Sequence, residues 1–241
     1  MMKKFAVFDI DGTLYRWQLY YSVVFELRKQ GVFSEDVALK IDEQYRKWQG
    51  KEASWADFSR PVVDAFLQNL GSIDLAEYRK ACDAVIKNES HKVYAYTLNL
   101  LRQLKRDGYT LVAITGSQHD IAQPFADKYH FDYCYGEIYT THEGKFSGEI
   151  ETIYNRKDEI VRRFLAEHPE HSLAGSVGIG DSHWDAKMLN LVENPIAFNP
   201  DEGLFAIAKE KGWAIVIERK NIAYKLEKHG TELVLADAVV Y

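Results

Sequence analysis

Apolar residues in this chain gather in short runs that recur at wide intervals, with amphipathic stretches between them. Each run has four or five residues and is rich in Val, Ile or Phe, and the runs cover residues 5–8, 110–114, 176–179, 195–198 and 214–217. Short apolar runs without strict alternation are typical of strands that are buried on both faces. The pattern therefore predicts an α/β fold with a doubly wound parallel sheet covered by helices.

The stretch from residue 15 to residue 90 has several amphipathic helical periods and no convincing strand. Helices are expected at about residues 17–30, 34–49, 53–70 and 74–87. A connection of roughly 75 residues is far longer than an ordinary crossover between parallel strands. We therefore expect a helical domain at residues 15–90, inserted after the first strand, and a core domain formed by residues 1–14 and 91–241.

Three further segments are interrupted by glycine or end the chain. Gly108 closes an expected helix at residues 91–107 and leads into the second strand. Residues 132–150 carry three glycines between pieces rich in Tyr and Ile, which predicts a β-hairpin. The apolar tail after about residue 222 is interpreted as either an edge strand or an association surface.

Composition limits the class of partner. The chain has 241 residues, 46% of them hydrophobic, and a formal net charge of −6, so we expect a full core and no basic face for nucleic acid. Cys82 and Cys134 lie far apart, and we expect no disulfide. No signal-peptide pattern or membrane-spanning run is found. These features favour a cytoplasmic protein without a membrane partner, and they leave its oligomeric state open.

Two acidic residues, Asp9 and Asp11, come directly after the first apolar run. Gly12 and Thr13 supply a turn that lets the chain leave the sheet. If the strand continues, both carboxylates point the same way; if it breaks after Asp9, one side chain and the next carbonyls can converge on a cation. Like charges at close range repel unless a metal or ligand compensates them. The pair therefore indicates Mg²⁺ chemistry on a phosphate.

Three later groups also fall at or just beyond expected strand ends, where open α/β sheets bind ligands. Thr115-Gly116-Ser117 is expected to open a helix, where a hydroxyl and free N–H groups suit a phosphate oxygen. Lys157 begins another expected helix and can neutralise phosphate charge. Asp181 and Asp185 follow a strand and are four residues apart, so on a starting helix they would share one face.

Each group alone is a weak signal, because such residues are more often turn formers, helix caps or solvated side chains. Their order, each beside a strand end, makes coincidence a poor explanation. The ordered set resembles the haloacid dehalogenase superfamily of phosphohydrolases. The residues that carry the resemblance are Asp9-Ile10-Asp11-Gly12-Thr13-Leu14, Thr115-Gly116, Lys157 and Gly180-Asp181-Ser182-His183-Trp184-Asp185.

The resemblance extends beyond these motifs to nearly the whole chain. The helical insertion resembles the C1-type cap of that family, and the sheet would be its Rossmann-like core. Residues 195–200, with Gly212-Trp213 further on, are similar to the phosphoserine-phosphatase-like subfamily, type IB. The match continues to about residue 213.

The resemblance implies a Mg²⁺-dependent phosphomonoesterase that forms an aspartyl-phosphate on Asp9. It also implies that Asp11 protonates the leaving alkoxide and later deprotonates the attacking water. Thr115 and the Gly116 N–H would hold the phosphoryl oxygens, while Lys157 neutralises their charge. The implied metal ligands are Asp9, the Asp11 backbone carbonyl, Asp181 and Asp185.

Substrate choice is expected to depend on the helical insertion and on two departures from phosphoserine phosphatases. Those enzymes have a glutamate nine residues after the nucleophile and an asparagine before the last motif aspartate, where this chain has Gln18 and Trp184. Both replacements remove polar contacts with substrate, so another small organic phosphate is favoured over phosphoserine. Tyr15, Trp17 or Tyr20 either line a pocket for the leaving group or belong to the core of the helical bundle.

Four alternatives to this small-molecule phosphatase remain open. The first alternative is a phosphoserine phosphatase proper, and the second is a phosphotransferase that passes the phosphoryl group to an alcohol. The third is a non-catalytic binding protein on the same fold, since fold does not guarantee activity. A signalling receiver module also uses an acidic cluster with Thr and Lys, but receivers are about half this length and lack the late acidic pair.

Overall fold

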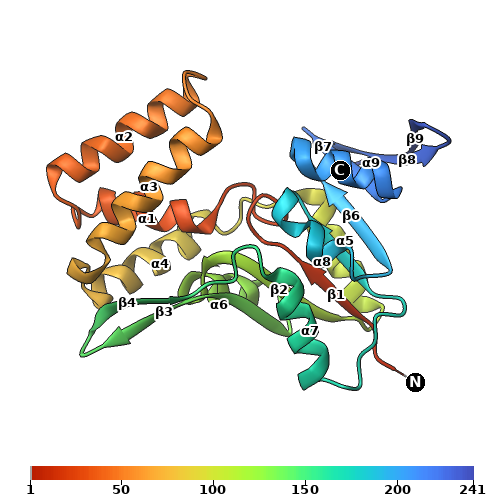
Figure 1. Ribbon diagram of the computed structural model, residues 1–241, viewed down its shortest axis with the longest axis horizontal. Coiled ribbons are helices and arrows are strands. Elements are labelled where there is room, and N and C mark those ends of the chain that lie inside the picture. The colour runs from red at the N-terminus through yellow and green to blue at the C-terminus, as the bar shows by residue number, and fades with distance from the viewer. Residues whose placement is uncertain (1) are drawn as a thin grey trace.

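A nine-stranded sheet runs through the protein, with strand order β4-β3-β2-β1-β5-β6-β7-β8-β9 (Figure 1). The computed structural model describes residues 2–241. Strands β3 to β7 of this order pair in parallel, and β4, β8 and β9 pair antiparallel to their neighbours. The strands are β1 Phe5–Phe8, β2 Thr110–Gln118, β3 Tyr133–His142, β4 Lys145–Glu151, β5 Val177–Gly180, β6 Asn194–Phe198, β7 Ala214–Arg219, β8 Ile222–His229 and β9 Glu232–Val240.

Helices cover both faces of the parallel part, which confirms the expected doubly wound α/β class. The side chains of β1 divide between the two layers: Phe8 belongs to a hydrophobic cluster that includes residues of α5 and α6, and Phe5 belongs to one that includes residues of α7, α8 and α9. All four β1 side chains are fully buried, as a central strand between two helical layers requires. These helices are α5 Ala95–Arg106, α6 His119–Lys128, α7 Lys157–Glu167, α8 Ala186–Leu189 and α9 Glu202–Lys211.

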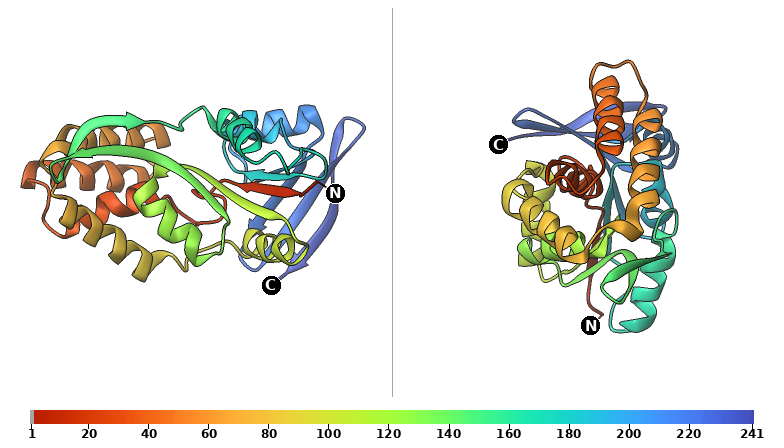
Figure 2. Two further views of the ribbon diagram at one scale, coloured as in Figure 1. Left: turned by 90° about the horizontal axis from the view of Figure 1, so that it is seen from below. Right: turned by 90° about the vertical axis from the view of Figure 1, so that its left-hand side faces the viewer.

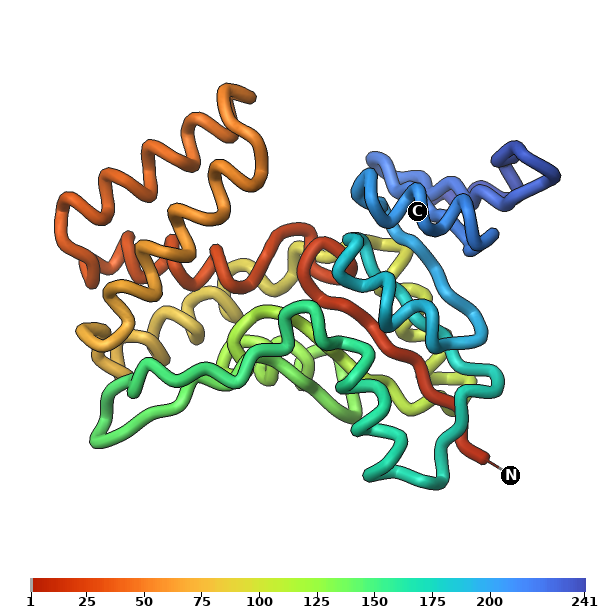
Figure 3. The backbone as a smooth tube through the Cα atoms, viewed as in Figure 1, coloured from red at the N-terminus to blue at the C-terminus, as the bar shows by residue number. Residues whose placement is uncertain are grey.

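A helical insertion, defined here as α1 to α4, lies between β1 and α5 in the sequence. It forms a separate group of helices at the left of Figure 3, joined to the sheet by two adjacent passes of the chain. The long β3–β4 hairpin extends from the sheet along these helices (Figure 2, left) and packs against them through Phe146 and Tyr78, whose ring centroids are 5.0 Å apart. Its helices are α1 Leu19–Lys29, α2 Glu35–Gln49, α3 Trp55–Asn69 and α4 Leu75–Glu89, with a 3₁₀ turn at Leu70–Ser72.

The two passes that join the helical insertion to the sheet pair with each other. Tyr15 and Val93 form an isolated antiparallel bridge, and the Arg16 N–H donates to the Lys92 carbonyl at 2.9 Å. Residues 91–94 are therefore part of a paired linker, and α5 begins at Ala95 rather than at residue 91. Backbone pairing of this kind satisfies the polar groups of both linkers without a helix.

The structure corrects the expectation at the end of β2. This strand continues to Gln118, which pairs with Glu137 of β3 beyond a register shift, and α6 begins only at His119. Thr115-Gly116-Ser117 therefore lies in a strand and not at a helix N-terminus. Any anion contact made here uses hydroxyls and strand N–H groups rather than the positive end of a helix.

The C-terminal residues extend the sheet past the layer of helices. Strands β8 and β9 form a hairpin at the upper right of Figure 1, and β9 is the edge strand. Eight of its nine residues are exposed. Of the two interpretations of the tail, the edge strand is confirmed. No helix within residues 2–241 is long and apolar enough to cross a membrane.

A buried carboxylate, Glu218, connects β7 to the linker and to α5. Its two oxygens accept the Ala95 and Tyr96 N–H groups at 3.2 and 2.8 Å, so it caps the start of α5. One of them also accepts from the Arg16 guanidinium at 2.6 Å. Its side chain is 1% exposed, whereas that of Arg16 is 44% exposed. The cap is therefore the part of this network that is protected from water.

Replacing Glu218 with Ala should lower the free energy of unfolding by about 1–3 kcal/mol, because two N–H groups at the start of α5 lose their acceptor. Arg16→Ala should cost less, since its charge is half exposed. Urea unfolding of both variants measures the difference, with the exposed Glu232→Ala as control. Equal midpoints for Glu218→Ala and Glu232→Ala would contradict the capping role.

Candidate active site

Three carboxylates gather where β1 and β5 end side by side. Asp9, Asp181 and Asp185 each offer an oxygen, and these oxygens all lie within 4.8 Å of one another. Gly12 makes this approach possible, because a Cβ at that position would lie 2.1 Å from an Asp181 oxygen. Its φ of +86° is also one that side-chain-bearing residues avoid. The turn after Asp9 thus brings two separate strand ends onto one charge cluster.

Lys157, the first residue of α7, supplies the compensating charge. Its ammonium donates to Asp9 Oδ1 and to Asp185 Oδ1, both at 2.6 Å, and its side chain is 8% exposed. Burial lowers the pKa of Lys157, but the charges and hydrogen bonds of Asp185 and Asp9 outweigh burial and raise it. The lysine therefore stays charged in the cluster.

The carboxylates carry more negative charge than one lysine balances. Burial raises the pKa of Asp9 to about 7, although Lys157 acts in the opposite direction. Burial, with the charge of Asp9 next, raises the pKa of Asp181 well above its usual value. Asp9 Oδ2 is buried and has no hydrogen-bond partner within the described residues. Such a set of hard oxygen donors with an unpaired buried oxygen fits a divalent cation.

Asp185 differs from the other two acids in how fully it is already bonded. One oxygen accepts from Lys157, and the other accepts from the Asp181 N–H, the Ser182 N–H and the Ser182 hydroxyl at 3.0 to 3.1 Å. It lies in a 3₁₀ turn, His183–Asp185, and its side chain folds back on that turn. The expectation that Asp181 and Asp185 share one face of a helix is therefore wrong.

Asp11 points away from the carboxylate cluster. Its Oδ1 accepts the Leu19 N–H at the start of α1 at 2.6 Å, and its Oδ2 accepts the hydroxyls of Thr115 and, at 2.7 Å, Ser117. Burial raises the pKa of Asp11, while these three donors act in the opposite direction. The strand breaks after Phe8, so Asp9 and Asp11 have different neighbours and are free to do different chemistry.

The structure places the remaining candidates around this site with unequal support. Thr115 is fully buried and bonded to Asp11, and Gly116 follows it in β2. Gln18 immediately precedes α1, and its side chain does not cap that helix. Trp184 packs between two rings, with centroid distances of 4.4 Å to Tyr154 and 4.2 Å to His183.

Of the three aromatic candidates, Tyr15 belongs to the core. It is fully buried, and its hydroxyl bonds to Ser22 and Glu89 at 3.0 and 3.1 Å, so the pocket-lining alternative is wrong for it. Tyr20 is 8% exposed and Trp17 half-buried; the Trp17 ring packs against other rings of the helical insertion.

The sequence did not reveal the contacts through which two residues are connected to this site. Ser117 bonds to Asp11, and Glu218 fixes the linker that carries Arg16. Both contacts join residues more than a hundred positions apart. No local pattern signals such contacts, although Ser117 already stood within the Thr-Gly-Ser motif.

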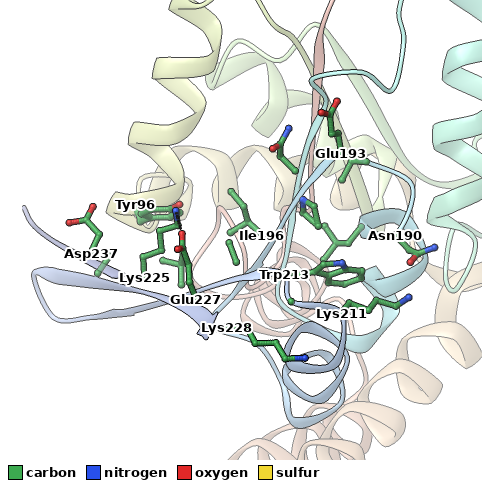
Figure 4. A pocket seen from close by; sticks show the side chains of 18 of the residues that line it. Tyr96, Asn190, Glu193, Ile196, Lys211, Trp213, Lys225, Glu227, Lys228 and Asp237 are labelled. Atoms are coloured by element: carbon green, nitrogen blue, oxygen red, sulfur yellow. Dashed lines mark ion pairs between the residues drawn. The ribbon is translucent and has the colours of Figure 1, made fainter. Parts of the chain in front are cut away.

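A cavity elsewhere in the molecule does not coincide with this cluster. It measures about 740 Å³ and is lined in part by Trp213, Tyr96 and Lys225, beneath the β8–β9 hairpin (Figure 4). Its other lining residues include those at the start of β6 and β7. Ligand sites of open parallel sheets lie at the opposite, carboxyl ends of the strands, where the carboxylates are.

A family model covers the part of the chain that carries this cluster. The model of the haloacid dehalogenase-like hydrolases matches residues 6–190, which include every residue of the cluster. The chain belongs to the haloacid dehalogenase-like hydrolases. This member of the family has a parallel sheet with helices on both faces and an acidic cluster at the strand ends.

Named relatives narrow the reaction to phosphatases. Histidinol-phosphatase of Neisseria meningitidis is 27% identical over 228 residues, covering 89% of this chain and 99% of the relative. Phosphoserine phosphatase SerB1 of Mycobacterium tuberculosis is 28% identical over 237 residues, covering 96% of this chain and 75% of the relative. This haloacid dehalogenase-like protein is a phosphatase-type hydrolase that acts on phosphoric monoesters.

Solved structures share the fold. A protein of unknown function from Bordetella pertussis Tohama I has a TM-score of 0.74 at 21% identity, covering 90% of this chain and 99% of its own. A phospho-aspartyl intermediate analogue of phosphoserine phosphatase has a TM-score of 0.60 at 19% identity, covering 91% of this chain and 95% of its own. At these identities the likeness concerns the fold.

A Mg²⁺ ion held by the carboxylate cluster should bind more weakly as the pH falls. The pKa of Asp9 is raised from 3.8 to about 7, so ionisation of this carboxyl without a compensating cation lowers the stability of the fold as pH rises from about 4 to 7. Below pH 7 protons compete with a cation for this carboxylate, so the Kd for Mg²⁺ should be about tenfold weaker at pH 6 than at pH 8.

Thermal unfolding of chelator-treated protein across a Mg²⁺ titration measures this effect. Asp181→Asn should abolish the Mg²⁺-dependent rise in Tm, and the exposed Asp237→Asn should retain it. A rise in Tm that survives Asp181→Asn would show that the cation binds elsewhere.

Proposed function

We propose that the protein is a Mg²⁺-dependent phosphomonoesterase that hydrolyses a small organic phosphate through an aspartyl-phosphate on Asp9. The single observation that carries the proposal is the buried Asp9 carboxylate, which is held by Lys157 on one oxygen and has no hydrogen-bond partner from residues 2–241 on the other. A carboxylate fixed in this way is held in one orientation, and one of its oxygens stays available for reaction or for a cation. Its position beside Asp181 and Lys157 supplies the charge neutralisation that attack on an anionic phosphate needs.

The reaction would proceed in two steps that leave the enzyme unchanged. In the first, an Asp9 oxygen bonds to phosphorus, the bond from phosphorus to the leaving oxygen breaks, and the Asp11 carboxylic acid gives that oxygen its proton. In the second, water attacks phosphorus and gives a proton to the Asp11 carboxylate, and inorganic phosphate departs from Asp9. Separate positions for the two carboxylates are what this division of labour requires.

The cation would be held by Asp9, Asp181 and the Asp11 backbone carbonyl, with Asp185 contributing directly or through water. Mg²⁺ prefers oxygen ligands and keeps several waters, which suits this donor set. When bound, it supplies positive charge next to the transferring phosphoryl oxygens. Asp185 already accepts hydrogen bonds on both oxygens, so its main contribution is to hold Lys157 and the turn that carries Asp181.

Thr115 and the Gly116 N–H would hold the phosphoryl oxygens. Without substrate the Thr115 hydroxyl donates to Asp11, so binding a phosphate would redirect that donor to the phosphoryl group. The exchange is favourable, because a charged phosphoryl oxygen replaces the carboxylic acid that the first step requires of Asp11. Lys157 would neutralise a further part of the phosphate charge.

We also propose that residues 15–90 form a cap over this site, with residues 1–14 and 91–241 as the core domain. The support is the paired linker between Tyr15 and Val93, which joins the helical insertion to the sheet directly beside Asp11. A cap in this position would exclude water and contact the leaving group. Gln18 and Trp184 would then meet the organic part of the substrate.

Phosphoserine phosphatase proper is the second candidate, supported by the named relative SerB1. Gln18 and Trp184 favour a different leaving group, since neither offers the charged contact that a carboxylate would give an ammonium. The packed rings of Trp184 and Tyr154 offer an apolar surface instead.

Free Cys82 and Cys134 agree with a reducing compartment such as the cytoplasm.

Turnover should depend on both Mg²⁺ and Asp9. Asp9→Asn removes the nucleophile without changing its size, so kcat on an aryl phosphate or any active metabolite phosphate should fall at least about a thousandfold. A Mg²⁺-dependent screen of phosphomonoesters with and without chelator measures this, and Asp237→Asn is the matched control. Full activity in Asp9→Asn would show that Asp9 is not the nucleophile. If the unmodified protein turned over no ester, the proposal that it is a phosphomonoesterase would be wrong.

A further inference from the structure

We propose that Ser117 is a positioning residue, which ties the proton-transferring carboxyl of Asp11 to the first helix of the helical insertion. The inference rests on the proposed function of Asp11. It concerns a hydroxyl that the two-step scheme does not use. Ser117 is 1% exposed, lies near the end of β2, and its hydroxyl contacts the first turn of α1.

The geometry gives Ser117 two partners on different elements. Its hydroxyl accepts the Tyr20 N–H at 2.9 Å and donates to Asp11 Oδ2 at 2.7 Å. Tyr20 lies in the first turn of α1, where N–H groups have no partner within the helix. The neighbouring N–H of that turn, on Leu19, donates to the other Asp11 oxygen at 2.6 Å. Two successive N–H groups of α1 are thus bound to Asp11, one directly and one through Ser117.

The direction of these bonds is fixed by the chemistry of the groups. A backbone N–H can only donate, so the Ser117 oxygen must accept from Tyr20. A hydroxyl carries a single proton, and Asp11 Oδ2 can accept it either as an ionised oxygen or as the carbonyl oxygen of the acid, with the acid proton on the other oxygen. Ser117 therefore has one consistent arrangement, in which movement of α1 and orientation of the Asp11 carboxyl are linked.

Thr115 does not make Ser117 redundant. Both hydroxyls donate to the same Asp11 oxygen, but the proposed function assigns the Thr115 hydroxyl to the phosphoryl group once substrate binds. Ser117 and the Leu19 N–H then remain as the donors that hold Asp11. Loss of the Ser117 hydroxyl should consequently slow most the step in which Asp11 gives a proton to the leaving oxygen.

Leaving-group dependence separates this role from a structural one. Ser117→Ala should lower kcat/KM for an alkyl phosphate, whose alkoxide must be protonated, by at least about tenfold more than for p-nitrophenyl phosphate. The value kcat/KM is the correct measure, because it covers the steps from substrate binding to departure of the leaving group. Ser117→Thr, which keeps the hydroxyl, should recover most of the alkyl activity, and Ser117→Cys, a weaker donor of similar size, should lie between.

Ser176→Ala is the matched control. Ser176 is also a fully buried serine with two hydrogen bonds, to the Leu173 carbonyl and from the Glu193 N–H, but it precedes β5 at the opposite end of the sheet. Its loss should lower stability without changing the ratio of alkyl to aryl activity. Inhibition by inorganic phosphate should be the same in Ser117→Ala and the unmodified protein, since Ser117 is not assigned to phosphate.

Two results would overturn the proposal. Equal losses of alkyl and aryl activity in Ser117→Ala would leave Ser117 with a structural role only. A parallel weakening of phosphate inhibition would make it a phosphate ligand instead. Both results presuppose Asp9-dependent turnover of p-nitrophenyl phosphate by the unmodified protein, so failure of this proposal and failure of the proposed function are distinguishable.

Discussion

The ammonium of Lys157 is the interaction on which the rest of this site depends. It lies within 2.6 Å of oxygens on Asp9 and Asp185 and is almost completely removed from water. Without it, three carboxylates at the ends of two neighbouring strands would repel one another in a medium that screens charge poorly. One lysine cannot balance three ionised acids, so burial and the neighbouring carboxylates raise the pKa values of Asp9 and Asp181, and a bound cation would favour their ionised forms.

The same region is where the helical insertion meets the sheet. Its linkers pair through Tyr15 and Val93, and Glu218 fixes their position by capping α5 and bonding Arg16. These contacts place the first turn of α1 against Asp11. A change in the orientation of the helical insertion must therefore pass through hydrogen bonds that also hold the proposed proton donor, which is a physical link between substrate enclosure and chemistry.

Much of the fold could be predicted from sequence because it depends on local patterns. The five apolar runs became parallel strands, and the amphipathic periods of residues 15–90 became helices, since burial on two faces or on one stripe leaves a periodic signature. The errors arose where tertiary pairing overrode a local signal. Thr115-Gly116-Ser117 has the composition of a helix start, yet it lies in β2 between Ile114 and Gln118, which both pair with β3.

The sequence by itself determined the order of acidic, hydroxyl and lysine groups at strand ends, and with it the family, because strand ends are marked by local composition. Only the tertiary structure decided which of those groups contact one another. It turned Asp9 towards Lys157 and Asp11 towards Ser117, and it placed Tyr15 in the core. These outcomes depend on contacts between residues far apart in the chain, whose distances are set by how the strands and helices pack and not by any spacing along the sequence.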